Sequence, residues 1–335
     1  MPVEVEARRY GSEKTGLIVG YVFEPGEPGV SVDADTAHEA IGRGRDVFAW
    51  LHFNLANQAC LRWLRQRLTL PDAFYESVQH ETSTRLDVIG DSLVAVINDA
   101  TVFGLETNEV SRLSICVTAR FIVTARQTPL RSVDRLADAV KARERFKSPL
   151  ELLAHLLQDQ ADILAQVVRD SAVEVDALED RLLVNQIMST RARLSAIRRM
   201  LVRLQRLLAP EPSAMFRMLN RPSEWVPLGD AERLRQAADE LSSSVSDCVA
   251  LVERVRLLQE EAAAAIDEQT NRILFILTGV TVVTLPMTII PGFLGMNVGG
   301  VPLRDHAGGF WLVVLLVLGL AGLGAYLLMR SRRDF

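Results

Sequence analysis

Two long segments without charge, close to the C-terminal end, constrain this chain more than any other feature of its sequence. Residues 273–294 and 307–329 contain no Asp, Glu, Lys or Arg. Each is longer than the roughly 20 residues that an α-helix needs to cross a hydrocarbon core of about 30 Å. Because only about a dozen residues separate them, we expect two membrane spans that form a helical hairpin.

Charges beside the two spans predict the orientation of this hairpin. Arg272 precedes the first span and a basic tail, 330–335, follows the second, whereas the connection carries Arg304 beside Asp305. Positive residues favour the cytoplasmic side, so we expect both termini of this multi-pass protein in the cytoplasm. The N-terminal segment lacks the apolar core of a secretory signal. Arg far outnumbers Lys, which we attribute to a GC-rich bacterium, and the expected location is its inner (cell) membrane.

The composition indicates a large soluble part in front of these spans. The chain has 335 residues, of which 24% are charged, and a net charge of −5. These values exclude a disordered chain and a strongly basic nucleic-acid binder. Three cysteines stand far apart without a CxxC pair, so neither a disulfide framework nor a zinc ribbon is indicated. We find no Walker loop, GxGxxG, GxSxG or metal-hydrolase motif, and therefore expect neither an enzyme nor a cofactor.

Runs rich in β-branched residues alternate with helical patterns before residue 149, which predicts a cytoplasmic α/β domain. The strands are expected at 17–23, 92–97 and 114–124, and the amphipathic helices at 54–68 and 133–146. Ser148 and Pro149 provide an N-cap and a first-turn proline. No Gly or Pro follows up to residue 209, so long helices are expected there, bent near 185–189, with a short helix near 213–220.

One very long helix is expected to connect the soluble part to the membrane. From Gly229-Asp230 to Pro286 the chain again lacks proline, which predicts a helix of roughly 90 Å at 1.5 Å per residue. The predicted division of the chain is a cytoplasmic α/β domain (1–148), antiparallel helices (149–228), a stalk and pore helix (229–294) that includes the first span (273–294), an extracellular loop (295–308), the second span (309–329) and a basic cytoplasmic tail (330–335).

A line of polar residues, which we call the seam, follows this long helix. Alternate steps of four and three residues trace one line of a left-handed supercoil. The seam consists of Glu253, Leu257, Glu260, Ala264, Asp267, Asn271, Leu274, Thr278, Thr281, Leu285, Thr288 and Gly292. Threonines in membrane helices also bond their own carbonyl groups or hold helices together. If several copies instead place the seam on a common axis, it forms a water-accessible path whose acidic rings favour cations.

The motif at the end of the first span resembles that of a known family. The segment from Pro286 reads PMTIIPGFLGMN, and its last three residues fall just after the first of two C-terminal spans. This placement, with Thr270-Asn271 entering the span, a short loop and a basic tail, resembles the CorA family of divalent-cation transporters. The continuation VGGVP and the ending RRDF are more similar to the zinc-transporting ZntB branch of that family.

This resemblance implies a homopentamer with a cytoplasmic funnel and a selectivity filter at the extracellular mouth. The filter residues would be Gly295, Met296 and Asn297. A ring of amides can hydrogen-bond the first-shell water of small dications, which dehydrate reluctantly. The implied pore continues along Thr288, Leu285, Thr281, Thr278, Leu274 and Asn271, and then meets cytoplasmic acidic rings of Asp267, Glu260 and Glu253. Glu260 is equally compatible with a solvated helix face.

The sequence contains no pattern typical of a dedicated site for a dehydrated metal. The acidic residues common in the family's mouth loop are reduced here to Asp305 beside Arg304, so cation attraction at the mouth would be weaker. His306 either binds metal or is solvated, and the other histidines lack HxxxH or HExxH spacing. Neither span contains an acidic residue or His, so the usual intramembrane proton relay is missing.

We therefore expect a transporter that imports Zn²⁺ through a central pore, with the lipid bilayer and copies of itself as partners. The residues leave the direction of transport and proton coupling open. The alternative is a CorA-type channel for Mg²⁺, Co²⁺ or Ni²⁺, gated by cytoplasmic divalent ions between carboxylates of neighbouring subunits. A second alternative is a membrane-anchored scaffold whose soluble domain carries the function. The seam argues against it, because an anchor has no reason to keep threonine on one face.

Overall fold

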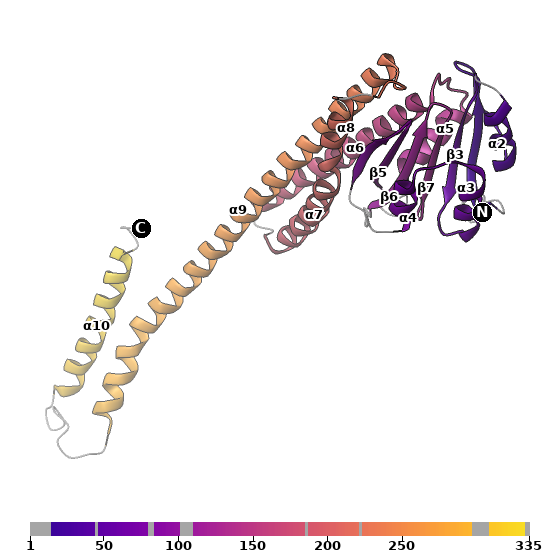
Figure 1. Cartoon of the computed structure of the whole chain (residues 1–335). Coiled ribbons are helices and arrows are strands. Elements are labelled where there is room, and N and C mark those ends of the chain that lie inside the picture. The colour runs from indigo at the N-terminus through magenta and orange to yellow at the C-terminus, as the bar shows by residue number, and fades with distance from the viewer. Residues whose placement is uncertain are drawn as a thin grey trace. The chain divides into compact units, whose positions relative to one another are not determined.

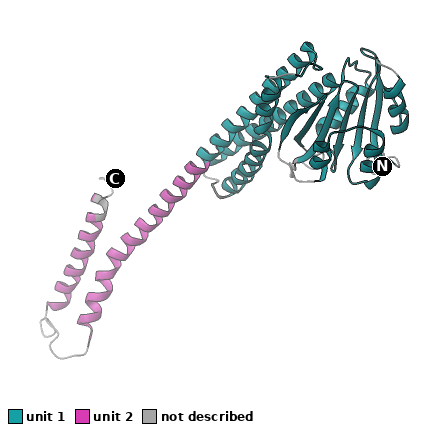
Figure 2. Ribbon diagram, viewed as in Figure 1, with its two compact units in different colours: residues 1–258 teal, residues 259–335 magenta. Residues whose placement is uncertain are grey.

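The computed structural model describes residues 15–43, 46–79, 84–100, 110–184, 187–220, 223–296 and 308–331 (Figure 1). The chain forms two compact units, residues 1–258 and residues 259–335 (Figure 2). The first unit contains a seven-stranded sheet with helices on both faces. This arrangement confirms the predicted α/β domain.

The sheet has the strand order β2-β1-β3-β7-β6-β5-β4. Its strands are β1 (Leu17–Phe23), β2 (Val30–Ser31), β3 (Phe48–Asn54), β4 (Arg85–Ile89), β5 (Ser92–Ala100), β6 (Val110–Thr118) and β7 (Phe121–Arg126). Strands β3 and β7 pair in parallel, whereas the other described pairs are antiparallel. The parallel pair brings together two segments that are far apart in the sequence.

The central strands are apolar on both faces because helices cover both. The helices are α2 (Ala34–Arg43), α3 (Gln58–Arg67), α4 (Asp72–Gln79), α5 (Arg131–Lys141), α6 (Pro149–Leu183), α7 (Ile187–Leu208), α8 (Pro210–Leu219) and α9 (Leu228–Leu294). Side chains alternate between the faces of a strand. In β3, Ala49, Leu51 and Phe53 therefore pack with α2, α3 and α4, whereas Phe48 and Trp50 belong to the core that includes α5 to α9.

The single strand predicted over 114–124 is wrong, because this segment forms a hairpin of β6 and β7 with Val117 opposite Ile122. The turn contains neither Gly nor Pro. Instead, Thr118 Oγ1 accepts hydrogen bonds from the backbone N–H groups of Arg120 at 3.3 Å and Phe121 at 3.2 Å. A threonine that closes a turn in this way has the same β propensity as its neighbours, so the local sequence does not reveal the break.

Two predicted helices are shorter in the structure than in the sequence pattern. The helix predicted from residue 54 begins only at Gln58, because the Asn57 side chain caps it by accepting the Ala59 N–H at 3.0 Å. The helix predicted over 133–146 spans Arg131–Lys141. It ends where Arg143 takes a positive φ of 65°, a conformation that stops a right-handed helix.

Capping residues near prolines position the long helices. Ser148 caps α6, accepting the Glu151 N–H at 3.0 Å and donating to Asp230 Oδ2 at 2.7 Å near the start of α9. The short helix predicted near 213–220 begins earlier, at Pro210, because proline is tolerated in a first turn. Pro286 and Pro291 lie within α9, which does not end at either.

A buried carboxyl group joins the sheet to the helices of the first unit. Glu211 of α8 is fully buried. Its Oε1 accepts the backbone N–H of Asn98 in β5 at 2.6 Å, and its Oε2 accepts Gln160 Nε2 of α6 at 2.7 Å. Burial raises the pKa of Glu211 to about 8, although these hydrogen bonds oppose the shift. Between about pH 4.5 and about pH 8, the folded chain therefore holds a proton on Glu211 that the unfolded chain releases.

We expect Glu211 to make the folded protein less stable as pH rises from about 4.5 to about 8, the ordinary and folded pKa values. Within this window the unfolded state binds fewer protons than the folded state, so the free energy of unfolding falls with pH, by at most on the order of 5 kcal/mol. Glu211→Gln should flatten the pH dependence of the melting temperature of the full chain in detergent. The exposed Glu224→Gln serves as control. A Glu211→Gln profile parallel to that of the wild type would contradict the prediction.

The second unit consists of the last part of α9 and of α10 (Gly309–Ser331). Both helices are long and apolar enough to cross a membrane. The apolar windows of the two helices are only 0% and 11% buried, unlike a core helix of a soluble protein. A Cβ atom added at Gly324 of α10 would lie 3.0 Å from Val282 Cγ1 of α9, so the helices are in close contact. Together these features confirm the predicted two-span hairpin.

Candidate ion pathway on the long helix α9

Between residues 273 and 294, one face of α9 is partly covered. Its less exposed residues follow one another at steps of four, three, four and four. They are Gly279, Val283, Pro286, Ile290 and Leu294. Exposed Val282 lies at the side of this face, and a Cβ built on Gly324 of α10 would lie 3.0 Å from its Cγ1. Because α10 is the other helix of the second unit, we assign the partial cover of the face to α10.

The seam lies on the other side of the helix. At 100° per residue, its centre is about 160° from the covered face. All of its membrane positions are exposed: Leu274, Thr278, Thr281, Leu285, Thr288 and Gly292. From Asn271, which is also exposed, to Gly292 the seam rises roughly 32 Å, close to the thickness of a hydrocarbon core. The sparse polar groups of the first span are therefore on the face that α10 leaves uncovered.

Two of the three threonine hydroxyl groups on this face donate to the backbone of their own helix. Thr281 Oγ1 donates to the Leu277 carbonyl at 2.9 Å, and Thr288 Oγ1 lies 3.3 Å from the Thr284 carbonyl and 3.1 Å from that of Leu285. Hydrogen bonds of this kind are the alternative role of membrane threonines, in which the hydroxyl bonds a carbonyl group of its own helix. A hydroxyl has one hydrogen and two acceptor lone pairs. Because the hydrogen of each hydroxyl is bonded to a backbone carbonyl, the oxygen can still accept hydrogen bonds from outside the helix. Both exposed side chains thus present acceptors, which suit cations and their water.

The carboxylates of the seam differ in their surroundings. Asp267 and Glu260 are exposed on the part of α9 that belongs to the second unit. Glu253, in the first unit, accepts hydrogen bonds of 2.6–3.1 Å from Arg256. The Arg256 guanidinium lowers the pKa of Glu253, so this carboxylate is ionised but already engaged by a cation. The seam residues follow one helix face in a single chain and do not converge on one point.

The structure describes only the beginning of the Gly-Met-Asn motif. The Gly295 N–H donates to the Pro291 carbonyl at 2.8 Å just beyond the end of α9, and Met296 is exposed. Asn297, Asp305 and His306 lie outside the described residues. Among the residues that are described, no group of three or more His, Cys, Asp or Glu side chains is placed to hold a metal ion.

The sequence reasoning missed the residues that pack the hairpin. Gly324 matters because a Cβ there would approach Val282 to 3.0 Å, and Gly279 lies on the same covered face of α9. Small residues commonly line the contacts between membrane helices. The run GLAGLGA at 319–325 contained this signal, but Gly319 and Gly322 are exposed, and only Ala321, Gly324 and Ala325 of its small residues are covered.

Comparison with known proteins places the chain among cation transporters. The family model described as CorA-like Mg2+ transporter protein matches residues 45–331. The divalent cation transporter CmaX of Pseudomonas aeruginosa is 29% identical over 336 residues, which cover 98% of this chain and 99% of CmaX. The zinc transport protein ZntB of Pectobacterium atrosepticum is 25% identical over 285 residues, 84% of this chain and 87% of ZntB.

Solved structures agree with these matches. The structure of full-length CmaX has a TM-score of 0.77 and 26% identity, and the match covers 96% of this chain and 99% of that one. The CorA magnesium transporter from Methanocaldococcus jannaschii has a TM-score of 0.75 over 93% of this chain and 98% of its own. At 18% identity, this second likeness concerns the fold alone.

Proposed function

Because this chain belongs to the family of CorA-like Mg2+ transporter proteins, we propose that it carries divalent metal cations across a membrane and that zinc is the ion it carries. It is a transporter, not an enzyme. The observation that carries the proposal is the polar, exposed seam on the face of α9 opposite α10. An apolar anchor would require no such face.

The seam requires several copies of the chain to form a path. Two spans cannot enclose a pore, and an exposed polar line facing lipid would be unfavourable. Bringing the seams of neighbouring chains together removes both problems, and the family resemblance favours five copies. We accordingly propose a homopentamer in the bacterial inner membrane with both termini in the cytoplasm. The division of the chain predicted from the sequence is retained as part of this proposal.

In the proposed path a hydrated ion first meets the filter of Gly295, Met296 and Asn297. It then passes alternating hydroxyl and apolar rings of Thr288, Leu285, Thr281, Thr278 and Leu274, followed by the amides of Asn271. Hydroxyl oxygens that already donate to the helix offer acceptors to the water shell of the ion. The cytoplasmic carboxylates of Asp267, Glu260 and Glu253 receive the ion at the end of the path, and Asp305 supplies weak attraction at the mouth.

Two considerations support zinc over magnesium, the second candidate ion. The residues after Asn297 are more similar to the ZntB branch, and a zinc transport protein of that name matches 84% of this chain. The competing magnesium reading is supported by the fold shared with the archaeal CorA. A path that contacts only the water shell of an ion does not discriminate strongly between two dications of the same charge. Import is the direction we propose.

Flux into liposomes tests this proposal directly. The purified full chain is reconstituted, and uptake of Zn²⁺ and of Mg²⁺ is followed with an internal fluorescent indicator, with and without a pH gradient. We expect zinc uptake above that of empty liposomes and above that of magnesium. Uptake of magnesium without uptake of zinc would support the alternative of a CorA-type magnesium channel. The absence of any cation flux would support the alternative of a membrane-anchored scaffold. A change in zinc uptake with the pH gradient would establish proton coupling.

A further inference from the structure

A polar cleft of about 800 Å³ lies in the first unit, where several strands of the sheet begin or end. Leu55 and Gln127 line it, and they directly follow the parallel strands β3 and β7. Ser111 and Arg112 line it from the start of β6, which runs antiparallel to β7. The carboxyl ends of β3 and β7 therefore lie at the cleft, and open α/β sheets commonly bind ligands at this end of their strands. None of the described lining residues belongs to the seam.

Helix α7 contributes two arginines to the cleft. Arg203 and Arg206 both line it, and their spacing of three residues makes them neighbours on one face of the helix. Asn98 of β5 attaches this part of α7 to the sheet, because its Nδ2 donates to the Leu207 carbonyl at 3.1 Å and to Thr84 Oγ1 at 2.9 Å. The two guanidinium groups are therefore positioned at the cleft by an anchored helix and not by a loop.

Both arginines keep their donors available. Arg203 and Arg206 are exposed, and neither has a hydrogen-bond or ion-pair partner among the described residues. Since α7 contains no acidic residue, the helix itself offers them no carboxylate three or four residues away. No Asp or Glu is among the described residues that line the cleft. The cleft therefore presents accessible positive charge that this part of the chain does not neutralise.

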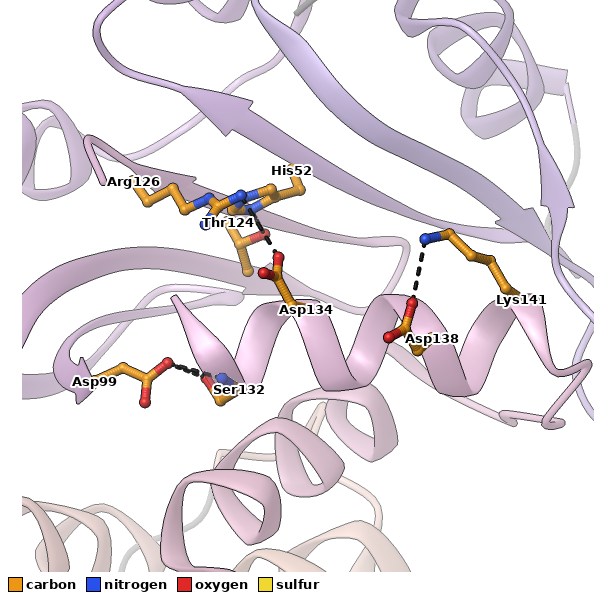
Figure 3. A network of polar contacts seen from close by, with 8 residues as sticks. All are labelled: His52, Asp99, Thr124, Arg126, Ser132, Asp134, Asp138 and Lys141. Carbon is orange, nitrogen blue, oxygen red and sulfur yellow. Dashed lines mark hydrogen bonds and ion pairs between the residues drawn. The ribbon is translucent and has the colours of Figure 1, made fainter. Parts of the chain in front are cut away.

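Basic side chains on the α5 side of the sheet differ from these two arginines, because they are paired. Arg126 Nη2 lies 3.6 Å from Asp134 Oδ1, and Lys141 Nζ lies 3.3 Å from Asp138 Oδ1 (Figure 3). The positive charges of that region are therefore balanced within the chain, whereas those of the two α7 arginines are left for a partner from outside it.

Charge and size indicate the class of ligand. A guanidinium presents its N–H donors in a planar fork that matches the oxygens of phosphate and carboxylate groups. Together with Arg112, the lining contains three guanidinium groups, which favours a ligand with several negative charges. A phosphate monoester carries about −1.5 to −2 at pH 7, whereas a carboxylate carries a single charge. The volume of the cleft is within the roughly 300–1,000 Å³ that is typical of sites for small organic ligands.

We propose that this cleft binds a small phosphorylated organic molecule, whose phosphate oxygens accept hydrogen bonds from Arg203 and Arg206. Inorganic phosphate would occupy only a small part of the cleft. The hydroxyl group of Ser111, which also lines it, is a further donor for a ligand oxygen. The site belongs to the first unit and uses no residue of the proposed cation path.

Calorimetric titration of the full chain in detergent tests this site with ADP, pyrophosphate and citrate as probes at matched ionic strength. Bound metal is first removed with EDTA and the chelator is dialysed away, so that no probe binds through a metal ion. We expect ADP to bind saturably at one site per chain and more tightly than citrate. Equal binding of pyrophosphate would show that the phosphate groups supply the affinity, and weaker binding that the organic part contributes. Citrate affinity equal to or above that of ADP, or no saturable binding of ADP, would overturn the proposal.

Substitutions in α7 locate the binding. The double variant of Arg203→Gln and Arg206→Gln removes both charges, retains good helix formers and should weaken ADP binding about tenfold or more. Arg191→Gln changes an exposed arginine of the same helix outside the lining. It lies roughly 18 Å before Arg203, beyond the screening length of about 8 Å at physiological salt, and should leave binding unchanged. If the double variant does not fold as judged by size-exclusion chromatography, Arg203→Gln alone decides, with an expected loss of about threefold. An affinity equal to that of Arg191→Gln would overturn the assignment.

Discussion

Asn297→Ala should abolish nearly all zinc flux into liposomes and leave the size of the oligomer unchanged. Asn297 follows the first span directly, within the Gly-Met-Asn motif. Its amide offers both donors and acceptors to the water shell of an incoming ion. Losing a charge-assisted contact of about 1.5–3 kcal/mol per subunit, even if only some subunits engage at once, would weaken ion binding tenfold or more. Inhibition by inert hexammine cations, which mimic a hydrated dication, should disappear as well.

Two further variants isolate the role of this amide. Asn297→Gln retains the amide on a longer side chain and should keep part of the flux, whereas Asn220→Ala, at an exposed position after α8, should transport as the wild type does. Flux and oligomer size are measured on the same preparation. Normal transport by Asn297→Ala, still blocked by the hexammine, would eliminate the hydrated-ion filter.

Replacing both Thr281 and Thr288 by Leu should close the path to hydrated ions without dissociating the oligomer. The substitutions turn two polar rings into apolar ones, and hydrophobic constrictions gate by dewetting. Since an unpaired polar group in an apolar surrounding costs about 1–3 kcal/mol, two such rings should lower zinc flux by more than roughly tenfold. Liposome uptake and size-exclusion chromatography in detergent provide the two measurements.

The structure supplies matched controls for the seam. The double Ser variant at the same two positions keeps both hydroxyl groups and should transport zinc. Thr284→Leu introduces the same change on the same helix, but outside the seam, and should retain most of the flux. Wild-type flux in the double Leu variant would mean that Thr281 and Thr288 are ordinary packing residues whose hydroxyl groups serve only their own helix.

Much of the membrane part could be predicted from the sequence because the signals are local. The absence of charge over 273–294 and 307–329 is sufficient to predict the two spans. The absence of proline before Pro286 is sufficient to predict the long helix. The seam also follows from sequence, since the positions that share a helix face depend only on the 3.6-residue period. The Gly-Met-Asn motif indicated the family that the comparisons then confirmed.

Features that depend on contacts between distant segments could not be predicted in this way. The sequence alone does not say that Thr118 closes a turn, that α10 covers the face of α9 opposite the seam, or that Thr281 directs its hydrogen inward. The polar sites of the first unit are further examples. His52 meets Thr124 across 72 residues, and Glu211 meets Asn98 across 113.

The division between the two kinds of information has a physical basis. Hydrophobicity and helical periodicity are properties of one segment, so the sequence by itself determined the hairpin, the long helix and the face that carries the seam. Burial of a polar atom, its hydrogen-bond partners and its pKa depend on which segments pack around it. Only the tertiary structure therefore decided that Glu211 holds a proton within the domain, and that Arg203 and Arg206 line a cleft with Ser111.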